Sequence, residues 1–397
     1  MSKEKVLIVG GGFAGTKTAL ELCEDERFEV TLLSDKEHLI YFPTLYHVAT
    51  GGARANASIA LKTIFEGKNV KLVTAKAKSL NRDTKILSTE DNKHFGYDSL
   101  ILALGQVTNY FNIPGLAELS FGVKSISDVE KLKIHLHNQL TSDHKPDLNY
   151  VIVGAGATGT ELAGSLQSYL LRIMEWHGIE KRPIHIDLVD SSPRVLPKIP
   201  KTASRRITKE LKRLGIRIYL NKRVEGEDAT ELEVNNKPIL SHTVIWTAGS
   251  ANNPFYGENN FSFSANHKIA TDVYLQAEED IYVLGDNANT PYSGMAQTAI
   301  YDAKFIASNL KRKAANKKFK SYKPKAPITV IPVREGWAGI FWGSLHIYGW
   351  LAWFLRQAAD IRAFHDFEPW SKALPQWFSY SSTEPVACTY CEKHKIN

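Results

Sequence analysis

Val6-Leu7-Ile8-Val9-Gly10-Gly11-Gly12-Phe13-Ala14-Gly15 is the stretch that decides the fold of this chain. An apolar run leads directly into a Gly-x-Gly-x-x-Gly pattern, which is typical of a buried strand, a tight turn and a helix. The glycines let the backbone approach a pyrophosphate closely, and the N-terminus of the following helix offers it unpaired N–H groups. The stretch therefore predicts a dinucleotide-binding unit at the start of the chain.

The same pattern occurs a second time. Gly154-Ala155-Gly156-Ala157-Thr158-Gly159 follows directly after the apolar run Val151-Ile152-Val153. One such fingerprint is weak evidence, but two in the same strand-turn-helix context predict two bound dinucleotides. One of them would deliver electrons and the other would hold them. We expect an α/β fold with two Rossmann-like dinucleotide-binding domains.

Three aspartates lie at the ends of predicted strands. Asp35 follows the first fingerprint by about 20 residues, the spacing of a ribose-binding carboxylate, although it could also be a solvated turn residue. Asp190 ends the strand that follows the second fingerprint, and a carboxylate there favours NADH over its 2′-phosphorylated form. Asp286 follows the predicted strand Asp280–Leu284, where it is either a turn residue or the acceptor for a flavin polyol chain.

Composition limits the class of protein. The 397 residues are enough for two or three domains, and 43% hydrophobic with 23% charged residues is ordinary for a globular protein. The net charge is +7, and the excess of basic residues is uneven along the chain. The apolar run at Val6 ends in the fingerprint glycines and does not resemble a signal peptide, so we expect the enzyme to face the cytosol.

The cysteines exclude two kinds of flavoenzyme. The chain has three, Cys23, Cys388 and Cys391, which do not make a disulfide framework. Disulfide reductases and sulfide:quinone reductases need redox cysteines in mid-chain, and none lies between Cys23 and Cys388. Electrons are therefore expected to leave the flavin directly. Cys388, Cys391 and His394 resemble only half of a metal site, so we predict no metal.

Several further stretches carry a family resemblance. They are Phe42 to Gly51, Tyr97 to Gly105 with Asn109-Tyr110-Phe111, Gly159 to Ala163, Arg194 to Pro197, Trp246 to Gly249, Ile281 to Asp286 and Ala296 to Ala299. On these residues the chain resembles the type II NADH:quinone dehydrogenases, non-proton-pumping members of the two-dinucleotide-binding-domain flavoprotein superfamily. The resemblance implies FAD in the first unit, NADH in the second, and a membrane quinone as electron acceptor.

The resemblance also implies a set of site residues. FAD would be bound by Gly10, Gly12, Phe13, Ala14, Gly15, Asp35, Gly105, Asp286, Ala296 and Gln297. NADH would be bound by Gly154, Gly156, Thr158, Gly159, Glu161, Asp190 and Gly249. Glu161 and Gln297 would be catalytic, although a glutamate in the first turn of the fingerprint helix, where we expect Glu161, could also simply complement the helix dipole.

The chain departs from the family pattern at two positions. Tyr301 stands where the family carries a second glutamine, one helical turn after Gln297, so Gln297 and Tyr301 become the predicted quinone contacts. Ser34 stands where an ungapped comparison expects the ribose carboxylate, which leaves Asp35 to serve one residue later. The predicted order is an FAD domain (1–117), an inserted NADH domain (118–264), the rest of the FAD domain (265–325) and a C-terminal region (326–397).

The C-terminal region has its own chemistry. It contains six of the eight tryptophans, and no Asp, Glu, Lys or Arg occurs from Gly336 to Leu355. We predict a hairpin over Ile328–Val333 and Trp337–Trp342, then a helix over Trp350–Phe364. On that helix one face carries Trp350, Trp353, Phe354, Ile361 and Phe364, and another carries Arg356 and Asp360. Just upstream is a basic cluster without acids, which consists of Lys311, Arg312, Lys313, Lys317, Lys318, Lys320, Lys323 and Lys325.

Aromatic and basic residues together predict peripheral, monotopic attachment to the cytoplasmic face of the cell membrane. The alternative is a solvated lysine face beside an aromatic homodimer interface. No nucleic-acid-binding motif accompanies the lysines, so no nucleic acid partner is expected. Two other functions stay open: a reductase of a small iron–sulfur protein, and an NADH sensor or docking protein.

Overall fold

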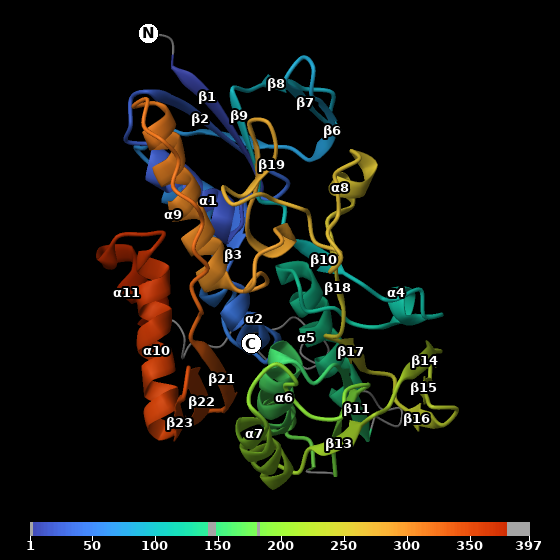
Figure 1. Ribbon diagram of the computed structural model, residues 1–397. Helices are drawn as coiled ribbons and strands as arrows, with labels where there is room; N and C mark the ends of the chain where they lie inside the picture. The colour runs from blue at the N-terminus through green and yellow to red at the C-terminus, as the bar shows by residue number, and fades with distance from the viewer. Residues whose placement is uncertain (1–2, 142–147, 181–182, 379–397) are drawn as a thin grey trace.

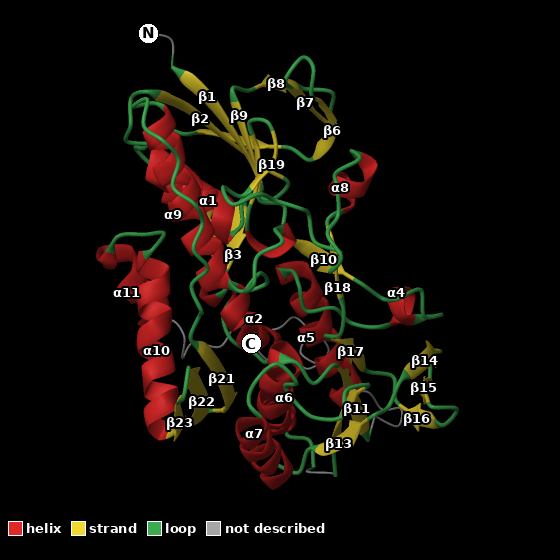
Figure 2. Ribbon diagram, in the orientation of Figure 1, coloured by secondary structure: helices red, strands yellow, loops and turns green. Residues whose placement is uncertain are grey.

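Two mainly parallel sheets, one behind each glycine fingerprint, organise the chain (Figures 1 and 2). The computed structural model describes residues 3–141, 148–180 and 183–378. The predicted α/β class with two Rossmann-like domains is confirmed, and the second domain is inserted into the first.

The first sheet has the strand order β19-β20-β9-β1-β2-β5. Its strands come from both ends of the domain: β1 (Glu4–Val9), β2 (Phe28–Ser34), β5 (Lys71–Thr74), β9 (Ser99–Leu102), β19 (Gln276–Glu278) and β20 (Ile281–Val283). The central strand β1 pairs in parallel with β2 and β9, so both of its edges are hydrogen-bonded, and its apolar run is buried. Helices α1 (Phe13–Leu22) and α9 (Ala296–Lys313) pack against each other beside this sheet (Figure 1).

The second sheet has the order β13-β12-β11-β17 and is wholly parallel. It consists of β11 (Asn149–Val153), β12 (His185–Asp190), β13 (Arg217–Leu220) and β17 (Val244–Trp246). Three helices accompany it: α5 (Ile126–Thr141), α6 (Ala157–Trp176) and α7 (Lys201–Arg213). The long α6 buries Leu162, Leu166, Tyr169, Leu170 and Ile173 at helical spacing.

A short antiparallel pair crosses between the two domains. Strand β10 (Gln106–Thr108) leaves the first domain and pairs with β18 (Ser250–Asn252), which returns from the second. The smaller sheets are β3 (His38–Ile40) with β4 (Ser58–Ala60), β6 (Ala77–Asn81) with β7 (Ile86–Thr89) and β8 (His94–Gly96), and β14 (Val224–Glu227) with β15 (Glu231–Val234) and β16 (Pro238–Leu240). The short helices are η1 (Phe42–Thr44), α2 (Leu45–Ala49), η2 (Arg54–Asn56), α3 (Leu61–Ile64), α4 (Leu116–Leu119), α8 (Pro254–Glu258) and η3 (Gly285–Asn287).

The C-terminal region forms a three-stranded sheet and two helices. Strands β21 (Thr329–Arg334) and β22 (Trp337–Trp342) make the predicted hairpin, and β23 (Leu345–Gly349) adds a third strand that the sequence analysis missed. Helix α10 (Trp350–His365) packs on this sheet and continues to α11 (Trp370–Phe378) (Figure 1). Within the described ranges, no helix is both long and apolar enough to span a membrane.

The predicted apolar face of α10 needs correction. Phe364 is buried in the first domain, where its ring lies 4.7 Å from that of Tyr41, and Trp353 and Ile361 are only partly exposed. The exposed large apolar residues are instead Trp350, Leu351, Phe354 and Leu355. The reason is that Arg356 and Asp360, expected on a separate polar face, are buried against the first domain. Helix α10 thus buries Arg356 and Asp360 and exposes Trp350.

Candidate functional site

The first fingerprint leaves an open space in front of a helix N-terminus. Gly10 has φ +113°, and a Cβ there would collide with the carbonyl of Ala103 on the neighbouring segment. A Cβ on Gly12 would meet nothing within 4 Å, and Gly12 caps α1 with no side-chain hydrogen bond. Phe13, Ala14 and Gly15 then form the buried first turn. Free N–H groups facing open space fit the pyrophosphate of a dinucleotide.

The second fingerprint repeats this geometry. Gly154 has φ +110°, and a Cβ on it would lie 2.7 Å from Thr247 Oγ1. Gly156 again faces open space and begins α6 without a side-chain cap, and Thr158 in the first turn is exposed. Gly159 lies against the Gly154 carbonyl, which holds the helix close to the strand. The chain thus carries two uncapped helix N-termini that both suit a pyrophosphate.

The carboxylates that follow the two second strands differ in their surroundings. Asp190 ends β12, where its carboxylate accepts hydrogen bonds from Ala155 N at 2.5 Å and Ser192 N at 2.6 Å. It is therefore fixed beside the second fingerprint. Asp35 is exposed, one residue past the end of β2. Ser34 is the residue that contacts the first fingerprint, because its Oγ would lie 2.6 Å from a Cβ on Gly11. The contact of Asp35 with a ribose stays a prediction.

Asp286 lies in η3 between two lysines. Burial raises the pKa of its carboxyl, while Lys268 and Lys124 act in the opposite direction. Its loop is held by Asp302 of α9, whose carboxylate accepts hydrogen bonds from Gly285 N at 3.1 Å and from the Tyr322 hydroxyl at 2.6 Å. Burial raises the pKa of Asp302 to about 6. The sequence analysis missed Asp302, because nothing in its helical spacing distinguishes it from a surface aspartate.

Two further glycines predicted to bind the cofactors lie at the crossing between the domains. Gly105 has φ +67° with open space beside it, between β9 and β10. Gly249 has φ +78° and precedes β18, and a Cβ there would lie 2.5 Å from the Asn109 carbonyl. The positive φ favours glycine at both positions, and the close Asn109 carbonyl excludes a side chain at Gly249. Both residues lie at the ends of the paired strands that join the domains.

Gln297 and Tyr301 both reach the segment that leads into the C-terminal region. Ala296 and Gln297 are the first residues of α9. The Gln297 amide donates to the Ile328 carbonyl and accepts from the Ile328 N–H, both at 3.1 Å. The Tyr301 hydroxyl donates to the Lys323 carbonyl at 2.9 Å. The structure brings the two predicted quinone contacts together on one face of α9, and their contact with a quinone stays a prediction.

Glu161 is the most perturbed acid near the second fingerprint. It lies in the second turn of α6, one turn later than expected, and its side chain is 9% exposed. Burial raises the pKa of its carboxyl from 4.5 to about 8, because desolvation outweighs the favourable charge of Arg356. Glu161 therefore holds a proton at neutral pH. A glutamate that only complemented the helix dipole would not need to be buried, as Glu161 is.

The neighbours of Glu161 come from two distant parts of the chain. The Arg356 guanidinium donates to the Asp360 carboxylate, and to the Pro43 carbonyl at 2.9 Å. The Tyr41 hydroxyl donates to the same carboxylate at 2.7 Å. The C-terminal helix, the Tyr41 segment and α6 thus share one buried polar cluster of Glu161, Arg356, Asp360 and Tyr41, which we call the buried ion cluster. The sequence analysis missed the buried ion cluster because it placed Arg356 and Asp360 on a polar face of the helix, apart from the apolar residues.

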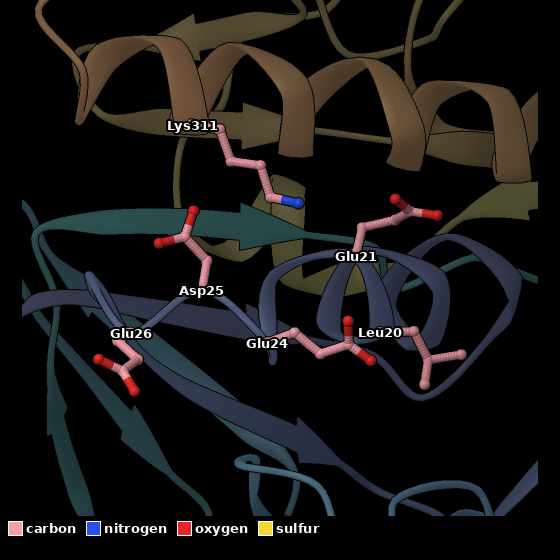
Figure 3. A pocket seen from close by; sticks show the side chains of 6 residues that line it. All are labelled: Leu20, Glu21, Glu24, Asp25, Glu26 and Lys311. Atoms are coloured by element: carbon pink, nitrogen blue, oxygen red, sulfur yellow. The ribbon is translucent and has the colours of Figure 1, made fainter.

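One surface depression lies away from both fingerprints. It is lined by Leu20, Glu21, Glu24, Asp25 and Glu26 at the C-terminal end of α1, together with Lys311 of α9 (Figure 3). This is the end of α1 opposite to Gly12, so the depression is not part of the cofactor site. In the part of the chain that is described, no group of three or more His, Cys, Asp or Glu side chains is placed to hold a metal. Cys388, Cys391 and His394 lie outside that part.

Comparison with known proteins agrees with this geometry. The family described as pyridine nucleotide-disulphide oxidoreductase matches residues 4–303, which is most of the chain. The chain belongs to this family. The predicted enzyme class, an oxidoreductase, is thereby confirmed.

Individual relatives refine the position within the family. A type II NADH:quinone oxidoreductase of Staphylococcus epidermidis is 26% identical over 91% of this chain and 96% of its own length. A structure of NDH2 from Plasmodium falciparum in complex with NADH superimposes with a TM-score of 0.85, at 16% identity, over 97% of this chain and 100% of that one. A sulfide:quinone oxidoreductase of Aquifex aeolicus gives 0.79 at 15% identity, over 97% of each chain. The resemblance predicted from the sequence motifs is confirmed.

Proposed function

We propose that this member of the pyridine nucleotide-disulphide oxidoreductase family is an FAD-dependent NADH:quinone oxidoreductase that does not pump protons. The observation that carries the proposal is that the two fingerprint helices both begin without a side-chain cap, and that the second one carries a buried carboxyl, Glu161, at the junction of the domains. Full-length similarity to a type II NADH:quinone oxidoreductase supports it. The absence of any cysteine from Glu24 to Ala387 supports it over thiol-based relatives.

The residues around each fingerprint fit the two cofactors. FAD would lie along Gly10 to Gly15, with Asp286, Ala296 and Gln297 beside its polyol chain and ring. NADH would lie along Gly154 to Gly159, with Asp190 accepting from the adenosine ribose. The bound flavin would supply the two-electron exchange between NADH and quinone.

The proton balance assigns a role to Glu161. Reduction of a quinone to a quinol by NADH consumes one proton in addition to the hydride. A carboxyl with a pKa of about 8 is protonated at neutral pH and can donate that proton from its Oε atom. The charges of Arg356 and Asp360 act on the group electrostatically, and Arg356 is held in place by Asp360 and Pro43. Glu161 is therefore proposed as the proton donor to the quinone. Gln297 and Tyr301 are proposed as the residues that contact the quinone.

We also propose peripheral attachment to a lipid bilayer, on its cytoplasmic side. The outer side of α10 exposes Trp350 (64%), Leu351 (51%), Phe354 (52%) and Leu355 (38%). An exposed run of large apolar side chains on the first turns of a helix, where the nearest charge, Arg356, is buried, is unfavourable in water and suits a membrane interface. The proposal places a lipid-soluble quinone close to Gln297, because the segment that Gln297 binds leads directly into β21.

Stopped-flow absorbance of the FAD-loaded enzyme tests the function. NADH should bleach the flavin faster than NADPH, and a quinone should restore the colour. Reoxidation by a ferredoxin but not by quinones would instead favour the iron–sulfur reductase. Bleaching without reoxidation by either acceptor would favour the sensor. A preparation that takes up no FAD would refute all three.

A further inference from the structure

Helix α7 presents a strongly basic surface. Its sequence contains six cations and one acid. The cations Lys201, Arg205, Arg206, Lys209, Lys212 and Arg213 are all exposed, whereas Ala203, Ser204, Ile207, Glu210 and Leu211 are buried. We call these six residues the α7 basic face. The single acid, Glu210, is buried beneath it, where its carboxylate pairs with Arg213 at 3.2 Å and Arg334 at 2.9 Å. Glu210 therefore pairs with only one of the six cations of the α7 basic face, Arg213.

This basic face adjoins the exposed apolar side of α10. The Arg206 guanidinium lies 4.3 Å from the centre of the Tyr348 ring on β23. Trp350, the most exposed residue of the apolar surface, follows only two positions later and begins α10. Arg334 of β21 adds a further cation, with Glu335 as one exposed carboxylate beside it. Figure 1 shows α7 next to β23 and the first turn of α10, along one edge of the molecule.

The lysine cluster predicted from the sequence lies elsewhere. Lys311 is at the C-terminal end of α9, where four carboxylates of α1 and the following turn surround it (Figure 3). Lys313 is paired with Asp280 at 2.8 Å and lies 3.5 Å from Glu4. Asp366, just after the C-terminal end of α10, lies 3.4 Å from Lys304 of α9. Trp350 is at the other, N-terminal end of α10. The α7 basic face, and not the end of α9 with Lys311 and Lys313, borders the apolar surface.

We propose that the α7 basic face binds the headgroups of anionic phospholipids, so that the NADH domain touches the bilayer beside α10. The inference rests on the proposed membrane attachment and adds a second, electrostatic contact to it. Apolar side chains enter the interface, and guanidinium and ammonium groups along its border meet phosphates. The proposal predicts that binding depends on lipid charge and weakens as salt increases.

Flotation with vesicles tests this inference. The FAD-loaded protein is mixed with vesicles of phosphatidylcholine alone, or of phosphatidylcholine with phosphatidylglycerol. The test variant is R205Q/K209Q/K212Q, which removes three charges from one stripe of α7 and leaves the Glu210 ion pairs intact. The control K317Q/K318Q/K320Q removes three charges from the cluster after α9. Glutamine keeps a helix propensity close to that of lysine and arginine.

We expect the α7 variant to bind phosphatidylglycerol vesicles about 100-fold more weakly, at about fivefold per removed charge. Its binding to phosphatidylcholine, and its rate with a water-soluble quinone, should stay unchanged. The control should bind like the parent protein. Equal weakening by both variants would overturn the inference, as would no weakening by the α7 variant.

Two other outcomes separate the inference from what it rests on. If the parent protein floats equally with both kinds of vesicle, membrane attachment holds and the headgroup contact is refuted. If it floats with neither, membrane attachment fails as well, while the quinone assay still reports on the enzyme. A dimer in sedimentation that the α7 variant dissociates would show that a second copy covers this face, which also overturns the inference.

Discussion

At the scale of single residues, burial decides the chemistry of this protein. Glu161 and Asp190 follow the same kind of fingerprint, yet their carboxyls differ. Asp190 accepts hydrogen bonds from the backbone N–H groups of Ala155 and Ser192. Glu161 is enclosed at the junction of the domains, and burial raises its pKa to about 8. One carboxylate is thus suited to accept from a ribose, and one carboxylic acid is suited to donate a proton.

Glu161→Gln should separate the two half-reactions. The amide cannot donate the proton that quinol formation needs, so quinone reduction should slow by about 100-fold. Reduction of the flavin by NADH should change by only a few-fold, and the loss of parent activity above pH 8 should be absent from the residual rate of the variant. Stopped-flow rates across pH 6 to 9 measure this. An equal loss in both half-reactions would contradict the role as proton donor.

The same substitution should change the pH dependence of stability. The folded protein keeps a proton on Glu161 up to a pKa of about 8, whereas the unfolded chain loses it near 4.5. The stability that this carboxyl contributes is therefore present at low pH and is lost as the pH rises to about 8. The free energy of unfolding of Glu161→Gln minus that of the parent should therefore rise by about 4 kcal/mol between pH 5 and pH 9, at about 1.4 kcal/mol per pH unit up to the folded pKa. Urea unfolding at the two pH values checks the sign; a constant difference would refute it.

Gln297→Phe should block the quinone and spare NADH. The ring cannot bond the backbone of Ile328, and it fills space at the start of α9. We expect the rate of quinone reduction to fall by at least tenfold while flavin bleaching by NADH persists. Tyr301→Phe tests the second proposed contact, because it removes only the hydroxyl that donates to the Lys323 carbonyl, and it should slow quinone reduction less. Slower bleaching in Gln297→Phe would mean that this residue serves the flavin and not the acceptor.

At the scale of elements, α10 is the part whose orientation could not be derived from its sequence. Helical spacing separates Arg356 and Asp360 from the aromatic residues, and both orientations of such a helix satisfy the pattern. The first domain determines the orientation of α10, because its Pro43 carbonyl accepts a hydrogen bond from Arg356 and its Tyr41 hydroxyl donates one to Asp360. Buried charges require such partners, and this protein supplies them from a segment more than 300 residues earlier.

Arg356→Met should destabilise the protein strongly. It leaves the Asp360 carboxylate buried without its guanidinium partner, which costs about 3 kcal/mol or more. Arg362→Met on the same helix is the control, since Arg362 is exposed and its ion pair with Asp366 should contribute below about 1 kcal/mol. Urea unfolding followed by tryptophan fluorescence measures both. Similar losses in the two variants would show that the buried ion cluster contributes little to stability.

At the scale of the whole molecule, function depends on how three parts meet. The crossing pair β10–β18 joins the two nucleotide-binding domains, and α10 closes over the first domain while its outer side stays apolar. Deleting everything after Lys325 would remove Arg356, Asp360 and Phe364 from the core of the first domain. Such a truncation would therefore confuse membrane release with unfolding, and surface substitutions are the better probe.

Trp350→Ser combined with Phe354→Ser should release the protein from neutral vesicles. Both side chains are more than half exposed, so the fold loses little, while interfacial burial of two large aromatics is worth about 3 kcal/mol or more. Phosphatidylcholine binding should weaken at least 100-fold, and reduction of a long-chain quinone in vesicles should fall with it. Reduction of a water-soluble quinone should persist. Unchanged flotation of this variant would show that the apolar side of α10 does not contact the membrane.

The sequence by itself determined the local parts of this protein. Fingerprint glycines, buried strands and the hairpin after Ile328 follow from short-range patterns, because turns and strand-to-helix transitions need particular residues at fixed spacing. Tertiary structure alone decided which charges are buried and which surfaces stay exposed. Glu161, Arg356, Asp360 and Tyr41 meet from three segments, and α7 comes to lie beside β23, because such contacts depend on the packing of whole domains.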